Sequence, residues 1–171
     1  MIKRIKQTAY LEGDFILRSG KRSRYYIDKY LFETCPDILK ALGEEFAKHV
    51  TDDVSLIAGA ELGGVALAAA TALETGKKWV IIRNSKKGYG TDKMVEGLLN
   101  AGDVVLLVED IATTGGQVLE AAKAITEAGA RVKKIVCVID RKQGARENIT
   151  KAGYTFESIL TKDDLGIKDE E

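Results

Sequence analysis

The chain has 171 residues, of which 45% are hydrophobic and 30% are charged, which is typical of one compact domain with its own core. Its 26 basic and 26 acidic residues cancel, so the composition argues against nucleic-acid binding through bulk charge. Two cysteines are too few for a disulfide framework. Because the sequence also lacks a long apolar stretch and a secretory signal at its start, we expect a cytoplasmic protein.

The first residues predict a small cap that precedes the main pattern. Apolar residues at helical spacing indicate a helix from Ile2 to Tyr10. Phe15–Leu17 and Tyr25–Ile27 are typical of short strands on either side of a turn at Ser19–Lys21. No linker or low-complexity segment marks a boundary, so one domain is expected over 1–171, with the cap at 1–34, an α/β core at 35–165 and a tail at 166–171.

Helices and strands are predicted to alternate after the cap. The expected helices are Pro36–Val50, Val65–Thr75, Gln117–Ala128 and Arg146–Ala152, and the expected strands are Leu56–Ala58, Trp79–Ile82, Val104–Val108, Val132–Ile139 and Phe156–Leu160. Because the strands are unbroken apolar runs, helices should cover both faces of the sheet, and the alternating order makes neighbouring strands parallel. The sequence therefore predicts an open, doubly wound α/β fold with a mostly parallel sheet, which binds ligands beyond the carboxyl ends of its strands.

The most informative segment is VVLLVEDIATTGGQ at residues 104–117. A buried strand leads into the adjacent acids Glu109 and Asp110, and the turn that follows opens a helix whose free N–H groups can hold a phosphate. Since carboxylates accept hydrogen bonds from vicinal hydroxyls, the combination favours a phosphorylated sugar as ligand. The alternative is an ordinary strand-to-helix turn in which the acids cap the helix.

Three further segments follow predicted strands. The glycine-rich turn AGAELGG at 58–64 can present N–H groups to an anion, or can serve only close packing. The basic segment 83–93 can neutralise a leaving group as a mobile loop, or can be a solvated hairpin. The pair Asp140–Arg141 can offer a guanidinium to a carboxylate or a base carbonyl, or can be a surface ion pair.

These segments, together with FILRSGKRSRYYID at 15–28, resemble the type I phosphoribosyltransferases and, among them, the orotate phosphoribosyltransferases over about residues 13–165. The resemblance implies the type I phosphoribosyltransferase fold and a Mg²⁺-dependent transfer of phosphoribosyl from 5-phosphoribosyl 1-diphosphate to orotate. The products would be orotidine 5′-phosphate and diphosphate, in pyrimidine biosynthesis. It also implies a homodimer, with neither a membrane nor a nucleic acid as partner.

The same resemblance assigns residues to the site. The implied contacts of 5-phosphoribosyl 1-diphosphate are Glu61, Leu62, Gly63, Arg83, Lys86, Lys87, Tyr89, Glu109, Asp110, Ala112, Thr113, Thr114, Gly115, Gly116 and Gln117. Those of orotate are Arg18, Tyr25, Tyr26, Thr113 and Arg141. Lys87, reaching a neighbouring subunit's site, and Asp110 are the implied catalytic residues, and Mg²⁺ would be held mainly by substrate oxygens and water. The family pattern usually has other residues at Asn84, Ala112 and Gln117.

Two other functions stay open at this point. One keeps the fold and changes the acceptor to a purine or uracil, which Arg141 and the Tyr25–Tyr26 segment disfavour. The other is a non-catalytic regulator that binds phosphoribosyl diphosphate or a base and contacts nucleic acid, which the zero net charge disfavours.

Overall fold

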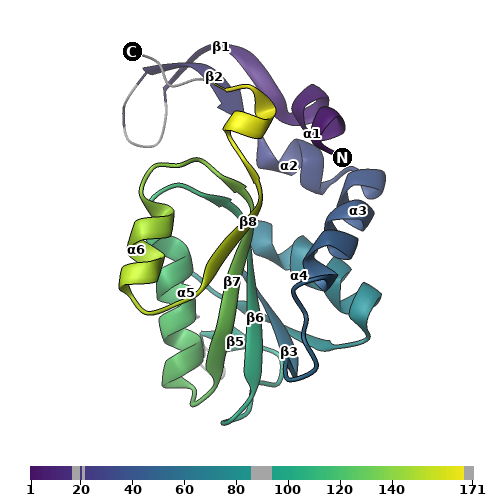
Figure 1. Cartoon of the computed structure of the whole chain (residues 1–171), viewed down its shortest axis with the longest axis vertical. Helices are drawn as coiled ribbons and strands as arrows, with labels where there is room; N and C mark the ends of the chain where they lie inside the picture. The colour runs from purple at the N-terminus through teal and green to yellow at the C-terminus, as the bar shows by residue number, and fades with distance from the viewer. Residues whose placement is uncertain (17–19, 21, 86–93, 168–171) are drawn as a thin grey trace.

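The computed structural model describes residues 1–16, 20, 22–85 and 94–167 (Figure 1). Its N-terminal part comprises helix α1 (Ile2–Ala9), an antiparallel hairpin of β1 (Tyr10–Ile16) and β2 (Arg22–Ile27), and the short helix α2 (Lys29–Glu33). Asp28 caps α2, since its carboxylate accepts a hydrogen bond from the Tyr30 N–H at 3.1 Å.

Within the described residues the main sheet has six strands in the order β5-β4-β3-β6-β7-β8. Their bounds are Leu56–Ala60 (β3), Lys78–Ile82 (β4), Val95–Glu96 (β5), Val104–Ala112 (β6), Arg131–Asp140 (β7) and Phe156–Thr161 (β8). Neighbouring strands are parallel except β5, which pairs antiparallel with β4. The prediction of a mostly parallel sheet is therefore confirmed.

Helices cover both faces of this sheet (Figure 1). One face carries α3 (Pro36–Ala47) and α4 (Gly63–Thr75), and the other carries α5 (Gly116–Glu127) and α6 (Ala145–Lys151). A turn of 3₁₀ helix, η1 (Asp163–Leu165), follows β8. None of the helices in the described part of the chain is long and apolar enough to cross a membrane.

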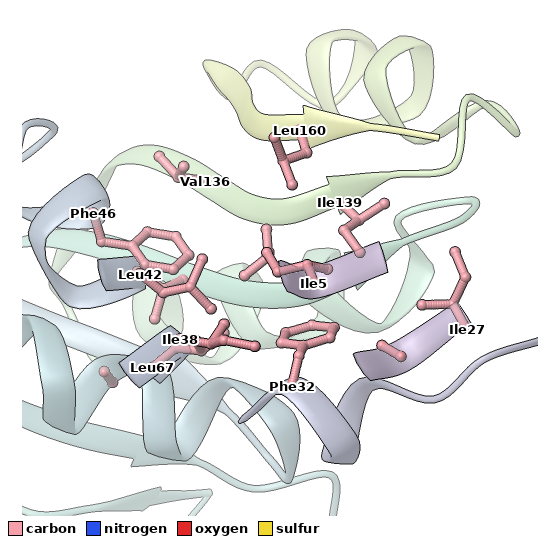
Figure 2. Packing of buried hydrophobic residues seen from close by; sticks show 14 of the residues in the cluster. Ile5, Ile27, Phe32, Ile38, Leu42, Phe46, Leu67, Val136, Ile139 and Leu160 are labelled. Carbon is pink, nitrogen blue, oxygen red and sulfur yellow. The ribbon is translucent and has the colours of Figure 1, made fainter. Parts of the chain in front are cut away.

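Two hydrophobic cores lie on opposite sides of the sheet. Because side chains alternate along a strand, Leu106 packs into the core beneath α3 and α4, whereas the next residue, Leu107, packs into the core beneath α5. The first core also contains Phe32 from α2 and Ile5 from α1 (Figure 2). The N-terminal elements are thereby fixed to the α/β core by apolar burial.

The structure corrects the expected elements at several points. The sequence did not predict α2, β5 or η1, and β1 begins at Tyr10, where a helix was expected to end. Strand β6 was expected to end at Val108, but it continues to Ala112 and includes both acids of the motif. Helix α3 ends at Ala47 rather than at Val50.

Candidate active site

A pocket of about 460 Å³ opens at the carboxyl-end edge of the sheet, between the N-terminal elements and the turn that joins β6 to α5. Three kinds of group line it: paired carboxylates, the turn with the first residues of α5, and cationic or aromatic side chains. The lining residues are Tyr26, Ile27, Lys29, Glu109, Asp110, Ile111, Ala112, Thr113, Thr114, Gly115, Gly116, Gln117, Val118 and Arg141. The residues of the segment 109–117 that were assigned from the resemblance, together with Tyr26 and Arg141, thus line one cavity.

The turn between β6 and α5 has the geometry of an anion site. Gly115 adopts the left-handed conformation (φ 80°) directly before α5, and an added Cβ there would lie 3.0 Å from Cγ1 of Ile149. The Asn148 Nδ2 donates to the Thr114 carbonyl at 2.9 Å and holds the turn from the side. The N–H groups of the first turn of α5 face the pocket without an acidic side chain among them, and such groups favour a bound phosphate.

Glu109 and Asp110 lie inside β6 and are almost fully buried, at 6% and 2% exposure. The Asp110 N–H donates to Oε1 of Glu109 at 3.2 Å, and the Ile111 N–H donates to Oδ1 of Asp110. Oε2 of Glu109 has no hydrogen-bond partner among the described residues. Burial, and then the neighbouring Asp110 carboxylate, raise the pKa of Glu109 well above its usual range. Glu109 is therefore a buried hydrogen-bonding group with an unused oxygen at the pocket floor.

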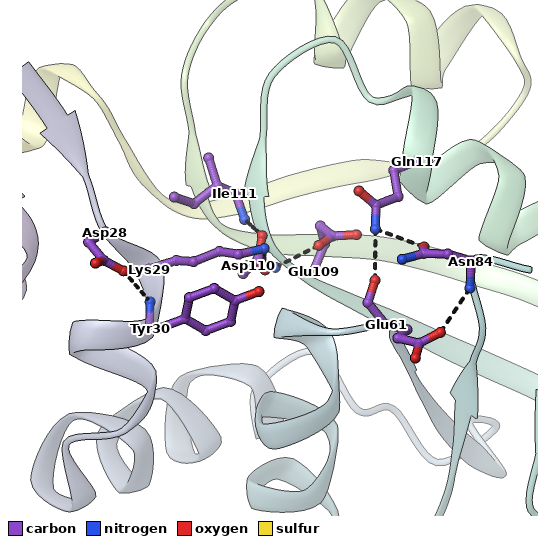
Figure 3. Close-up of polar contacts among 9 residues, drawn as sticks. All are labelled: Asp28, Lys29, Tyr30, Glu61, Asn84, Glu109, Asp110, Ile111 and Gln117. Carbon is purple, nitrogen blue, oxygen red and sulfur yellow. Dashed lines mark hydrogen bonds and ion pairs between the residues drawn. The ribbon is translucent and has the colours of Figure 1, made fainter. Parts of the chain in front are cut away.

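Lys29, which the sequence analysis missed, is the cation that faces these acids (Figure 3). Its Nζ lies 2.5 Å from Oδ2 of Asp110 and 5.2 Å from the centre of the Tyr30 ring. Burial alone would lower the pKa of Lys29, but Asp110 outweighs it and the pKa is raised. A lysine inside the mostly apolar stretch 25–32 was the one signal in the sequence that could have indicated it.

A third carboxyl group lies close to Lys29 and Asp110. Glu33, at the end of α2, is 4% exposed, and its Oε1 has no hydrogen-bond partner among the described residues. Burial and the nearby Asp110 raise the pKa of Glu33 to about 8. The sequence analysis missed this residue too, because α2 is too short to show a periodic pattern.

The turn after β3 packs directly against the acids. A Cβ added to Gly63 would lie 1.5 Å from Oδ2 of Asp110, so only glycine fits there. The Glu61–Leu62 peptide bond is cis, and the Leu62 side chain is 60% exposed. Glu61, Leu62 and Gly63 border the site, but they are not part of the pocket lining.

Three side chains connect this turn with its neighbours (Figure 3). The Gln117 Nε2 donates to the Glu61 carbonyl at 2.7 Å and to Oδ1 of Asn84 at 2.9 Å. The Asn84 N–H donates to Oε2 of Glu61 at 3.1 Å. Arg83 points along its own loop, where its Nε donates to the Ser85 carbonyl at 3.2 Å, and it does not line the pocket.

At the opposite end of the pocket, Arg141 follows β7. Its backbone N–H donates to the Ala112 carbonyl at 2.9 Å, and its Nη2 donates to the Tyr25 hydroxyl at 3.3 Å. Its Nε is buried and has no partner among the described residues. The Arg141 guanidinium also lies 5.7 Å from the Tyr25 ring centre. Arg141 and Tyr26 line the cavity, whereas Tyr25 contacts Arg141 without being part of the lining.

Arg18, Lys86, Lys87 and Tyr89, all assigned from the resemblance, lie outside the described residues. Among the residues that the structure does describe, no group of three or more His, Cys, Asp or Glu side chains is placed to hold a metal ion.

Comparison with known proteins identifies the family and the fold. The family model of the phosphoribosyl transferase domain matches residues 32–170. The orotate phosphoribosyltransferase of Natronomonas pharaonis is 46% identical over 153 residues, which cover 90% of this chain and 87% of that protein. A crystal structure of orotate phosphoribosyltransferase from Mycobacterium tuberculosis, in complex with Fe(III) dicitrate, has a TM-score of 0.88 at 30% identity and covers 97% of each chain. Another structure of that enzyme, in complex with 5-phospho-α-D-ribosyl 1-diphosphate, has a TM-score of 0.83 at 27% identity, covering 97% of this chain and 96% of that one.

Proposed function

The chain belongs to the phosphoribosyltransferase family, and from this premise we propose that it is an orotate phosphoribosyltransferase. It transfers the phosphoribosyl group of 5-phosphoribosyl 1-diphosphate to a ring nitrogen of orotate and releases orotidine 5′-phosphate and diphosphate, a step of pyrimidine biosynthesis. The observation that carries the proposal is the single pocket in which Glu109 and Asp110, the turn before α5 and Arg141 meet.

The reaction is a displacement at the anomeric carbon of the ribose. The bond from this carbon to the diphosphate oxygen breaks and its electron pair leaves with diphosphate, while the ring nitrogen of orotate supplies the pair for the new bond. Because bond breaking runs ahead, positive charge develops on the ribose and negative charge on the leaving group. The site must therefore hold both substrates in line and stabilise the departing anion.

We assign the sugar phosphate to the β6–α5 turn. The N–H groups and hydroxyls of residues 113–117 bind the 5′-phosphate, remote from the reacting carbon, so that its binding energy orients the ribose. Glu109 and Asp110 accept hydrogen bonds from the ribose hydroxyls. Oε2 of Glu109, which has no hydrogen-bond partner among the described residues, supports this role.

We assign orotate to the part of the pocket lined by Tyr26 and Arg141, together with Tyr25, which contacts Arg141, and Arg18. The Nε of Arg141 has no hydrogen-bond partner among the described residues, and the guanidinium can donate to the carboxylate or a carbonyl of the base. Glu61, Leu62, Gly63, Arg83, Lys86, Lys87 and Tyr89 are assigned to the diphosphate on the family resemblance.

We further propose that Mg²⁺ accompanies the diphosphate. The two carboxylates of β6 are hard oxygen ligands of the kind that Mg²⁺ prefers, but the second of them is paired with Lys29, so most ligands would be substrate oxygens and water. When bound, the ion neutralises the charge that develops on the leaving diphosphate. The proposed working unit is a homodimer in the cytoplasm, in which Lys87 of each copy reaches the neighbouring site.

The test is orotate consumption, followed by ultraviolet absorbance, with 5-phosphoribosyl 1-diphosphate and Mg²⁺ supplied. We expect consumption that depends on every component and that falls at least tenfold in Lys87→Ala, equivalent to about 1.4 kcal/mol of barrier. Lys78→Ala is the matched control, because Lys78 is an exposed lysine at the amino end of β4, on the opposite edge of the sheet.

Absence of consumption by folded protein would refute the proposal. The same protein would then be assayed with adenine, guanine, hypoxanthine and uracil as acceptors. Activity with one of these would identify a salvage transferase, and inactivity with all of them would favour a regulatory role.

A further inference from the structure

The amide of Gln117 lies where three loops of the site meet (Figure 3). These loops follow β3, β4 and β6, and β3 pairs with both other strands, so the loops are neighbours at one edge of the sheet. Both protons of the Gln117 amide are used, one on the Glu61 carbonyl and one on Oδ1 of Asn84. The N–H of Asn84 returns to the Glu61 carboxylate, which closes a ring of three hydrogen bonds.

This ring connects two parts of the proposed substrate site. Gln117 belongs to the first turn of α5, which is assigned to the 5′-phosphate, whereas Glu61 and Asn84 belong to the turns assigned to the diphosphate. Neither of the two latter residues lines the described pocket, and Asn84 follows Arg83 directly. The ring therefore fixes the separation between the two anion-binding regions.

We propose that Gln117 and Asn84 are positioning residues, which hold the 5′-phosphate loop and the diphosphate loops at the separation that 5-phosphoribosyl 1-diphosphate requires. The inference rests on the proposed function, because it is this substrate that spans both regions. Loops that are already held in place lose less conformational freedom when the ligand binds, so the bridge favours binding of the spanning ligand. The bridge does not favour binding of a ligand that occupies only one of the two regions.

The hydrogen bonds of the Gln117 side chain favour a positioning role over direct contact of this side chain with the substrate. Its Nε2 is committed to two acceptors that lie in the other loops, and its shape allows both bonds at 2.7 and 2.9 Å. Since Gln117 and Asn84 are both exposed, their removal leaves the hydrophobic cores intact. A loss of binding in such variants would thus not follow from a damaged core.

The experiment measures the dissociation constants of 5-phosphoribosyl 1-diphosphate and of ribose 5-phosphate for the full chain, with Mg²⁺ present. The variants are Asn84→Ala, Gln117→Ala, the double variant, and Gln117→Met, which keeps an unbranched side chain of similar size but cannot donate. We expect Asn84→Ala to raise the dissociation constant of 5-phosphoribosyl 1-diphosphate three- to tenfold. Gln117→Ala and Gln117→Met should each raise it about tenfold. The double variant should bind 5-phosphoribosyl 1-diphosphate no more than twofold more weakly than Gln117→Ala does.

For ribose 5-phosphate, which occupies the 5′-phosphate loop alone, we expect changes below twofold in Asn84→Ala and Gln117→Met. In steady-state assays the same variants should raise the KM for 5-phosphoribosyl 1-diphosphate and leave kcat within about threefold. Thermal unfolding of each variant establishes that it is folded. If Gln117→Ala does not fold, Asn84→Ala and Gln117→Met carry the comparison.

Three results would overturn the inference: wild-type affinity in Gln117→Met, additive losses in the double variant, or equal weakening of both ligands. Wild-type protein that binds neither ligand would instead refute the proposed function, so the two failures are distinguishable.

Discussion

The ammonium group of Lys29 and the carboxylate of Asp110, 81 residues apart in the chain, lie 2.5 Å from each other at the floor of the pocket. Asp110 is almost fully buried, whereas the Lys29 side chain keeps 29% of its surface exposed toward the cavity. The N-terminal cap therefore supplies the charge that makes burial of the β6 carboxylates feasible, because an unpaired carboxylate is costly away from water. The N-terminal cap and the carboxyl-end edge of the sheet are thus joined by an ion pair inside the pocket.

The first prediction concerns this ion pair. Lys29→Met leaves the Asp110 carboxylate buried and unpaired, and we expect a loss of about 1–3 kcal/mol in the free energy of unfolding, less than for a fully buried pair because Lys29 is partly solvated. Urea unfolding at pH 7 measures it. Lys40→Met is the matched control, since Lys40 is 77% exposed and lies 3.9 Å from Glu44 on the surface of α3. It should change stability by less than about 0.5 kcal/mol.

A double-mutant cycle separates the pair from other effects of the lysine. If the ion pair is responsible, the double variant Lys29→Met/Asp110→Asn should lose less free energy of unfolding than the two single variants lose in sum. Strict additivity would show that Lys29 acts on stability through its packing against Tyr30 rather than through Asp110.

The second prediction concerns the close approach of Gly63 to Asp110. In Gly63→Ala the new methyl group would meet Oδ2 of Asp110 at 1.5 Å, so the acid or the whole turn must shift. We expect a stability loss of about 1–3 kcal/mol and a fall in kcat/KM of at least tenfold, because small displacements at the reacting centre are costly. Urea unfolding and steady-state assays measure the two effects.

Gly116→Ala serves as the stability control for this change. Its added Cβ would come no closer than 3.9 Å to Oγ1 of Thr114, and alanine favours a helix over glycine. We expect equal or higher stability than in the parent protein. A comparable loss in both variants would contradict the steric explanation for Gly63.

The third prediction concerns the base end of the pocket. Tyr25→Phe removes the hydroxyl that orients Arg141 but keeps the ring beneath the guanidinium, and we expect the KM for orotate to rise about fivefold, equivalent to roughly 1 kcal/mol. Arg141→Gln should raise it at least tenfold. In both variants the KM for 5-phosphoribosyl 1-diphosphate should stay within about twofold.

Tyr154→Phe is the matched control, because the Tyr154 hydroxyl lies 3.4 Å from Oγ1 of Thr126, away from the pocket. It should leave both KM values unchanged. Equal rises in the two KM values after Arg141→Gln would contradict an assignment of this residue to the base.

The sequence predicts the parts of the fold that depend on local pattern. The apolar runs of β3, β6, β7 and β8 and the turn before α5 are recognisable because a fully buried parallel strand and a helix start have distinct compositions. Helix α2 has five residues, so its position depends on burial of Phe32 and on the Asp28 cap rather than on periodicity. Strand β5 exists only by pairing with the end of β4.

The site shows the same division between local and distant causes. Glu109 and Asp110 were predicted as site residues because two acids beside a glycine-rich turn form a local motif. Because they are charged, β6 was predicted to end before them, at Val108. They can continue the strand because Lys29 and the Gly63 turn close around them, and neither contact is encoded nearby in the sequence. The hydrogen-bond ring of Gln117 likewise joins residues 33 and 56 positions apart.

The last prediction concerns Glu33 and pH. A folded-state pKa of about 8, against the usual value of 4.5, means that the folded protein binds a proton at Glu33 that the unfolded chain releases between these two values. Stability from this group therefore falls as pH rises from about 4.5 to 8. Glu33→Gln cannot ionise, so its free energy of unfolding relative to the parent protein should increase by about 2–4 kcal/mol between pH 5 and pH 8.

Urea unfolding of the parent and the variant at pH 5, 6.5 and 8 measures this difference directly. Glu120→Gln, at an exposed position on α5, is the control and should show the same difference from the parent at all three values. The comparison isolates Glu33 from Glu109, because the raised pKa of Glu109 affects the parent and the variant alike. A difference between Glu33→Gln and the parent that stays constant with pH would show that the pKa of Glu33 is not raised in the folded protein.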